Sequence, residues 1–288
     1  MRTIRTVAEL RAALTGARRE ERSIALVPTM GAFHAGHAAL MRRAHALCDV
    51  VVVSLFVNPR QFGAGEDLTR YPRDEAHDAE LAAEQDVDLL FAPPPAEVYP
   101  DGFATTVSVA GGLTDGLCAG PRGAEHFSGV ATIVLKLLNM TRPDVVVLGQ
   151  KDAQQAAVIR RLVADLNLAV RVDLHPIVRE ADGLAMSSRN AYLTPADRPH
   201  ALALSRALGA AEEQVAAGRA DAEHVTAAAR GALDADGVEP EYVELVDPTS
   251  LRPAASVNGE TLLAVAARVG SARLIDNVLL HGHSPLKP

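Results

Sequence analysis

Tryptophan is absent from this chain, and aromatic residues of any kind are scarce. Phenylalanine and tyrosine together account for 3% of its 288 residues. Single-stranded nucleic acids are commonly held by stacking bases on aromatic rings, and few such rings are present. Positive charge is also in short supply, because 36 acidic residues outnumber 28 lysines and arginines and give a net charge of −8. We therefore expect no nucleic-acid partner, and an anionic ligand would need positive charge gathered locally.

Cysteine and long apolar runs are scarce too. The two cysteines, Cys48 and Cys118, do not form a C-x-x-C pair, so a disulfide framework or zinc knuckle is not expected and a reducing cytoplasm fits best. No apolar run approaches the roughly 20 residues that span a bilayer. Glu9 and Arg11 interrupt the N-terminal segment, unlike the continuous core of a signal peptide. The sequence predicts a cytoplasmic enzyme without membrane contact.

Short apolar runs and amphipathic runs alternate through the first 180 residues. Strands are predicted over 23–29, 49–58, 87–93, 143–149 and 169–177, and helices after Gly36 and over 73–85, 127–140 and 152–166. The run "VVVVSLFV" is almost wholly apolar, as expected when both faces of a parallel sheet are covered. This alternation predicts an α/β fold with an open parallel sheet, of the Rossmann-like kind.

The pattern changes near residue 180. An alanine-rich helical region runs to about residue 235, and three short apolar runs, "EYVELVD", "TLLAVAARVG" and "ARLIDNVLL", follow it. Strands gathered at the end of the chain predict a smaller α+β domain. We divide the chain into an N-terminal domain, 1–178, and a C-terminal domain, 179–288.

The stretch "PTMGAFHAGH", residues 28–37, joins the first of these strands to a helix. Gly31 and Gly36 permit a sharp turn and close approach of a ligand, and a helix start offers N–H groups to a phosphate. His34 and His37, three residues apart, lie on one side of the first helical turn and can donate hydrogen bonds to phosphate oxygens. The alternative is that both histidines only cap or pack the helix start. The spacing matches neither G-x-G-x-x-G nor the P-loop motif.

Polar residues follow other strands of the expected sheet, and ligands of such sheets bind at the carboxyl ends of the strands. "GQKDAQQ" places Lys151 and Asp152 at a helix start, where the lysine suits phosphate and the aspartate suits a helix cap. Gln61 and Gln155 offer neutral donors and acceptors for a hydroxy-carboxylate, although either glutamine taken alone is more simply interpreted as a solvated polar side chain.

Two further segments are weaker signals taken alone. "AMSSRN", 185–190, offers the Ser187 and Ser188 hydroxyls and the Arg189 guanidinium to triphosphate oxygens, but it is also an ordinary turn composition. The glycine-rich stretch 120–129 is expected to be a loop, either a lid over the site or a plain surface loop.

Taken together, these motifs resemble the pantothenate synthetase (pantoate–β-alanine ligase) family over nearly the whole chain. "PTMGAFHAGH", "VSLFVNPRQF", "YPRD", "FSGV", "VLGQKDAQQ" and "READGLAMSSRN" occur in the order and spacing of that family. The resemblance implies an H-x-G-H nucleotidyltransferase fold. It also implies an AMP-forming ligase that condenses (R)-pantoate with β-alanine through pantoyl adenylate, using ATP and Mg²⁺ and releasing AMP and pyrophosphate.

The resemblance also implies roles for individual residues. His34, His37, Lys151 and Arg189 would be catalytic, with His37 donating to the departing pyrophosphate. Pantoate would meet Gln61 and Gln155, and β-alanine would meet Gln61. ATP would contact Met30, Gly31, Ala32, Phe33, His34, Ala35, Gly36, His37, Gly149, Gln150, Lys151, Asp152, Val178, Met186, Ser187, Ser188 and Arg189.

The family pattern further suggests a homodimer and a C-terminal domain that acts as a lid and supplies the Met-Ser-Ser-Arg segment. Gln150 and Ala153 replace the usual acidic and aromatic residues of that family's "GEKDY". The acidic cluster after "YPR" is thinned, so metal ligands are left unassigned. Two other functions remain open at this stage: a nucleotidylyltransferase that moves AMP or CMP onto a phosphorylated acceptor, and a non-catalytic nucleotide-binding protein.

Overall fold

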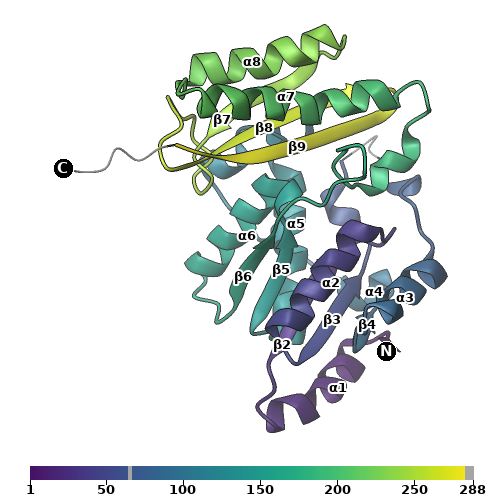
Figure 1. Ribbon diagram of the computed structural model, residues 1–288. Coiled ribbons are helices and arrows are strands. Elements are labelled where there is room, and N and C mark those ends of the chain that lie inside the picture. Colours follow the sequence, from purple (N-terminus) through teal and green to yellow (C-terminus); the bar gives the residue numbers. More distant parts are fainter. Residues whose placement is uncertain (64–66, 283–288) are drawn as a thin grey trace. The chain divides into compact units, whose positions relative to one another are not determined.

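The structure is a computed structural model that describes residues 1–63 and 67–282. It divides into two compact units, one formed by residues 1–149 and 158–176 and the other by residues 150–157 and 177–288. Each unit has its own sheet, drawn in Figure 1. Within the described residues, no helix combines the length and the apolar character needed to cross a membrane.

The first unit is built on a six-stranded parallel sheet in the order β1-β4-β3-β2-β5-β6. The strands are β1 (Arg2–Ile4), β2 (Ile24–Thr29), β3 (Val50–Leu55), β4 (Leu89–Phe91), β5 (Val145–Gly149) and β6 (Arg171–His175). Five of the six residues of β3 are buried, which explains its almost wholly apolar sequence. The sheet confirms the Rossmann-like α/β fold expected from the alternating pattern.

Helices connect these strands. They are α1 (Val7–Arg19), α2 (Ala35–Leu47), α3 (Glu75–Glu84), α4 (Pro95–Val98), α5 (Ala119–Thr141) and α6 (Ala153–Asp165), whose residues up to Ala157 group with the second unit. One face of the sheet packs against Met41 and Ala44 of α2 and Ala82 of α3. This packing sets α2, and the loop before it, at the carboxyl end of β2.

The second unit is an α+β layer pair. Figure 1 shows α7 (Arg198–Ala216) and α8 (Ala222–Ala235) side by side over the antiparallel sheet of β7 (Pro240–Val246), β8 (Glu260–Val269) and β9 (Ala272–His281). Alanine and leucine on the two helices pack with valine and leucine of the strands into one core. This arrangement confirms the predicted α+β character of the C-terminal part.

Two segments differ from the sequence interpretation. The stretch 120–129 is not a loop, because α5 begins at Ala119 and is interrupted by a non-helical residue at Gly123, with φ 73°. The helix thus begins further toward the N-terminus than expected. Strand β1 and helix α1 were not anticipated, although Thr6 and Glu9 form a reciprocal capping box at the start of α1.

Candidate active site

The loop between β2 and α2 carries the two histidines singled out in the sequence. His34 is the N-cap residue of α2, and its Nδ1 accepts a hydrogen bond from the Gly36 N–H at 3.1 Å. The Nδ1 of His37 accepts one from the His34 N–H at 3.3 Å, and the two ring centroids are 4.2 Å apart. The capping role considered for these histidines is therefore real, and it occupies one nitrogen of each ring.

The cap determines which ring nitrogen of a neutral imidazole carries the proton. A neutral imidazole has one N–H donor and one acceptor nitrogen, so a ring that accepts at Nδ1 carries its proton on Nε2. His34 and His37 thus hold their donor protons on the nitrogen opposite the helix cap. Such donors, beside a helix N-terminus, suit oxygens of a phosphate group.

A buried carboxylate holds the backbone just before these histidines. Asp78 of α3 is 1% exposed, and its oxygens accept hydrogen bonds from the N–H groups of Ala32 at 2.9 Å and Phe33 at 2.6 Å. Burial raises the pKa of Asp78 above its ordinary value, although these two hydrogen bonds act in the opposite direction. Asp78 lies in the polar stretch "DEAHDAE", and sequence reasoning missed it because the helix looks solvent-facing.

Gly31 is required by the same contact. Its φ is +89°, and a β-carbon there would lie 2.6 Å from Leu55 Cδ1 and 2.8 Å from Asp78 Oδ2. Only glycine tolerates both the backbone angle and the approach of α3. The glycine therefore serves the packing of the loop against Asp78.

Gln61, which the sequence offered as a contact for a hydroxy-carboxylate, lies in the first unit. Its side chain is buried, because the residue is only 8% exposed. Its Oε1 accepts a hydrogen bond from Asn58 Nδ2 at 3.0 Å, and the same amide nitrogen donates to the Gly129 carbonyl at 3.1 Å. Tyr99 donates its hydroxyl to Asn58 Oδ1 at 2.8 Å, and His126 Nδ1 donates to the Gln61 carbonyl at 2.6 Å. Gln61 is therefore held on its side chain by Asn58 and on its backbone by His126, through contacts that the sequence alone did not predict.

The glycine of "FSGV" allows this arrangement. A β-carbon on Gly129 would lie 2.1 Å from the Arg60 carbonyl oxygen and 2.8 Å from the Gln61 N. Helix α5 can therefore approach the 3₁₀ turn Pro59–Gln61 only because residue 129 has no side chain.

Two cations lie over the aromatic rings beside Gln61. The Arg60 guanidinium is 5.1 Å from the centroid of Phe103, and Lys136 Nζ is 4.6 Å from the same centroid. Burial lowers the pKa of Lys136. The surroundings of Gln61 thus include positive charge, despite the acidic balance of the whole chain.

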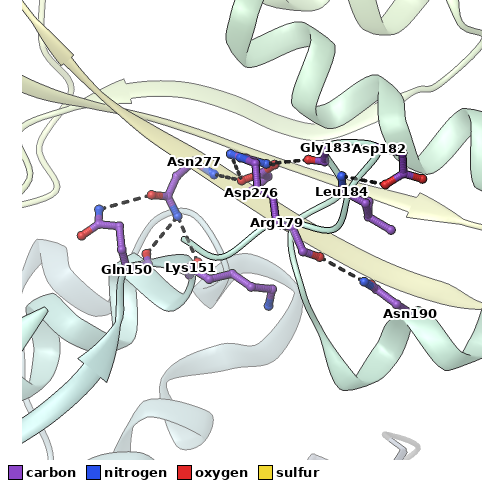
Figure 2. Close-up of polar contacts among 10 residues, drawn as sticks. Gln150, Lys151, Arg179, Asp182, Gly183, Leu184, Asn190, Asp276 and Asn277 are labelled. Carbon is purple, nitrogen blue, oxygen red and sulfur yellow. Dashed lines mark hydrogen bonds and ion pairs between the residues drawn. The ribbon is translucent and has the colours of Figure 1, made fainter. Parts of the chain in front are cut away.

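The second unit carries the other expected ATP residues. Gln150, Lys151 and Asp152 form a 3₁₀ turn, and Gln155, half-buried, lies in the first turn of α6 that follows. Among the described residues, the Lys151 ammonium has no ion-pair partner, which suits a role in binding an anion. The side chain of Asn277 contacts the backbone of this turn, as Figure 2 shows.

The serine–arginine segment is also ordered in this unit. Ser187 caps a short 3₁₀ helix, Ser188–Tyr192, by accepting the Arg189 N–H at 3.2 Å. The Met186 N–H donates to the Val178 carbonyl at 2.9 Å, so two of the expected ATP contacts are neighbours in one hairpin. The expected site residues thus divide between the units: 30–37, Gln61 and Gly149 in the first, the rest in the second.

Residues 1–63 and 67–282 form no protein cage for Mg²⁺. Within the part of the chain that the structure describes, no three His, Cys, Asp or Glu side chains gather in a way that could hold a metal ion. Asp78 is the carboxylate beside the histidine loop, and both its oxygens already accept backbone N–H groups. The described residues therefore do not fit a dedicated metal site.

Comparison with known proteins identifies the family. The pantoate-beta-alanine ligase family model matches residues 2–279. The chain belongs to the pantoate–β-alanine ligase family. Pantothenate synthetase from Heliobacterium modesticaldum is 51% identical over 288 residues, covering 97% of this chain and 99% of the relative. That from Pseudomonas aeruginosa is 50% identical over 283 residues, covering 98% and 99%.

Solved pantoate–β-alanine ligases have the same fold. The crystal structure of pantothenate synthetase from Thermus thermophilus superposes with a TM-score of 0.92 at 47% identity, covering 96% of this chain and 99% of the other. The ligase from Francisella tularensis, complexed with beta-gamma ATP and beta-alanine, gives 0.80 at 32% identity, with 97% of each chain covered.

Family membership fixes the reaction. The protein is a ligase of pantothenate biosynthesis that joins pantoate to β-alanine at the expense of ATP. The resemblance stated from the motifs is confirmed. The two other functions left open by the sequence, transfer of a nucleotide to a phosphorylated acceptor and nucleotide binding without catalysis, are set aside.

Proposed function

We propose that the ligation proceeds in two steps through pantoyl adenylate. A carboxylate oxygen of pantoate attacks the α-phosphorus of ATP, forming the acyl–phosphate bond while the bond to pyrophosphate breaks. The amine of β-alanine then attacks the acyl carbon, forming the amide as the carbon–oxygen bond to AMP breaks and the amine releases a proton. Both steps need positioning and charge stabilisation more than a protein nucleophile.

The main support for this proposal is the loop between β2 and α2, which leads into His34 and His37. Because the Nδ1 atoms of His34 and His37 accept backbone N–H groups, their Nε2 protons are the donors for phosphate oxygens, with His37 serving the leaving pyrophosphate. Lys151 and Arg189 add positive charge, and Ser187 and Ser188 add hydroxyl groups. ATP is bound along 30–37, Gly149–Asp152, Val178 and Met186–Arg189.

Two glutamines are assigned to the binding of pantoate and β-alanine. Gln61 and Gln155 bind the carboxylate and hydroxyl groups of pantoate, and Gln61 also meets β-alanine. The anchoring of Gln61 by Asn58 and His126 supports this assignment, because a fixed amide can orient a small polar substrate. The Francisella tularensis relative, which binds beta-gamma ATP and beta-alanine, supports the same substrates here.

Other parts of the proposal rest on the family resemblance. Mg²⁺ would be held by ATP phosphates and water, as that ion often is. The chain would be a cytoplasmic homodimer, in which residues 1–178 bind nucleotide and pantoate and residues 179–288 act as a lid. Light scattering of the purified protein would measure the dimer directly, and a monomeric mass would overturn that part.

The adenylate route is tested by isotope exchange. The purified chain is given ATP, Mg²⁺ and labelled pyrophosphate, and incorporation of label into ATP is measured with and without pantoate. Pantoate-dependent exchange in the absence of β-alanine is expected. If pantothenate forms in the complete mixture but no exchange occurs until β-alanine is added, the separate adenylate step is wrong.

A further inference from the structure

Two adjacent polar residues are buried in strand β9. Asp276 is 3% exposed and Asn277 is 4% exposed, within the otherwise mostly apolar strand "ARLIDNVLLH". Burying polar groups costs free energy unless their hydrogen bonds are satisfied. The hydrogen-bond partners of these two side chains therefore show which segments the buried residues hold in place.

The amide nitrogen of Asn277 donates its hydrogen bonds to the backbone of the turn Gln150–Asp152. Its Nδ2 donates to the carbonyl oxygens of Gln150 at 3.1 Å and Lys151 at 3.0 Å, as Figure 2 shows. Its Oδ1 accepts from Gln150 Nε2 at 3.2 Å. The whole amide is thus committed to one short turn, which lies 126 and 127 residues away in the sequence.

Asp276 is satisfied by the hairpin that leads to the serine–arginine segment. Its oxygens accept both terminal nitrogens of Arg179, at 2.6 and 3.0 Å, and the Asn277 N–H at 2.8 Å. Arg179 in turn donates to the Gly183 carbonyl at 3.1 Å and pairs through its backbone with Ala185. This ion pair holds the hairpin whose ends are Val178 and Met186.

The geometry points to Asn277 as a positioning residue that holds the Gln150–Asp152 turn in place for ATP. Asp276 holds the hairpin between Val178 and Met186 in the same way. This inference rests on the proposed ATP contacts. In a trans peptide the C=O and the following N–H point in opposite directions. Carbonyls of Gln150 and Lys151 that face Asn277 therefore turn the N–H groups of Lys151 and Asp152 the other way, the orientation in which a phosphate of ATP would meet them at the start of α6.

The test compares ATP affinity in single variants of the full chain. ATP binding with Mg²⁺ is measured by calorimetry, and KM is measured separately for ATP and for β-alanine. Asn277→Ala should weaken ATP binding roughly tenfold, the usual effect of losing hydrogen bonds that order a ligand-binding segment, and leave KM for β-alanine unchanged. Asn277→Ser keeps one donor and should lie between Asn277→Ala and wild type; it also decides the matter if Asn277→Ala does not fold.

Val278→Ala is the matched control. Val278 is the next residue of β9 and packs against the core of the second unit, so its truncation should lower Tm without changing ATP affinity. Wild-type ATP affinity in Asn277→Ala, or an equal loss in Val278→Ala, would overturn the inference. Absence of pantoate-dependent exchange in the wild-type enzyme would instead refute the adenylate route, and the ATP affinities would still decide the role of Asn277.

Discussion

Asp78 and Phe33 are joined by a 2.6 Å hydrogen bond from the Phe33 N–H to the Asp78 carboxylate, although 45 residues separate them in the chain. The same carboxylate holds the Ala32 N–H. Helix α3 thus fixes the backbone that leads directly into His34. The position of the histidine pair depends on a buried acid that does not need to touch a substrate.

Asp78→Asn should therefore slow catalysis indirectly, by loosening the backbone at Ala32 and Phe33. The amide keeps one acceptor oxygen but turns an NH₂ group toward the other backbone N–H, which leaves a buried donor unpaired. We expect the free energy of unfolding to fall by about 1–3 kcal/mol and pantoate-dependent exchange to slow by about tenfold. Glu75→Gln, on the same helix but in an exposed ion pair with Arg5, should change neither measurement appreciably.

The pH dependence of this stability has a defined sign. Because burial raises the pKa of Asp78, the folded chain holds the carboxyl proton to higher pH than the unfolded chain does. The resulting stabilisation is complete below the unfolded pKa and is lost as pH rises through the folded pKa. Denaturation across this window should show wild type losing stability relative to Asp78→Asn; the opposite trend would mean that the two N–H groups outweigh burial.

Tyr99→Phe tests the anchoring of Gln61. Burial raises the pKa of Tyr99 to about 12, so its hydroxyl remains a donor to Asn58 throughout the usual assay range. Removing the hydroxyl should cost about 1 kcal/mol of stability and raise KM for pantoate. The wild-type rate should show no inflection from Tyr99 below about pH 10, the ordinary tyrosine pKa, and an unchanged KM in the variant would separate Tyr99 from the site.

Gly129→Ala should displace the turn that carries Gln61. The new β-carbon would clash with the Arg60 carbonyl, and such overpacking typically costs about 1–3 kcal/mol. We expect a lower Tm and a higher KM for pantoate. Gly16→Ala is the control, because a β-carbon there meets nothing within 4 Å in helix α1 and should stabilise the chain slightly.

His37→Ala and Lys151→Ala should each reduce adenylate formation by about 10²–10³-fold, the usual cost of removing a group that stabilises developing charge. Circular dichroism should show that both variants fold. His224→Ala, which removes an exposed histidine of α8 paired with Asp221, should retain the wild-type rate. Near-wild-type exchange in His37→Ala or Lys151→Ala would eliminate the proposed roles.

The sequence was informative where function depends on local pattern. Alternating strands and helices, the glycines around His34 and His37, and Lys151 before a helix are all visible in short windows. The residues that hold these groups were not visible, because their contacts are distant in sequence. Asp78 lies in a stretch that reads as a polar helix face, and Asn277 in a stretch that reads as an apolar strand.

The glycines show the same limit more sharply. Gly120, Gly123 and Gly129 made the stretch 120–129 look like a loop, yet only Gly123 leaves the helical conformation. Gly129 is helical, and its missing side chain instead leaves room for the Arg60 carbonyl to lie against α5. Composition could not distinguish a glycine that bends the backbone from one that makes room for a neighbour. The missed helix α1 is different, since the Thr6–Glu9 spacing was readable as a capping box.

The hairpin of β8 and β9 has one consequence for evolution and engineering. Gly270 and Ser271 alone link the strands, and the pairing of Val269 with Ala272 fixes every later pair, including Ala264 with Asn277. A one-residue slip would turn each side chain of β9 to the opposite face. If Asn277 positions the Gln150–Asp152 turn as inferred, an insertion or deletion that shifts this register should weaken ATP binding without altering any of the proposed ATP contacts.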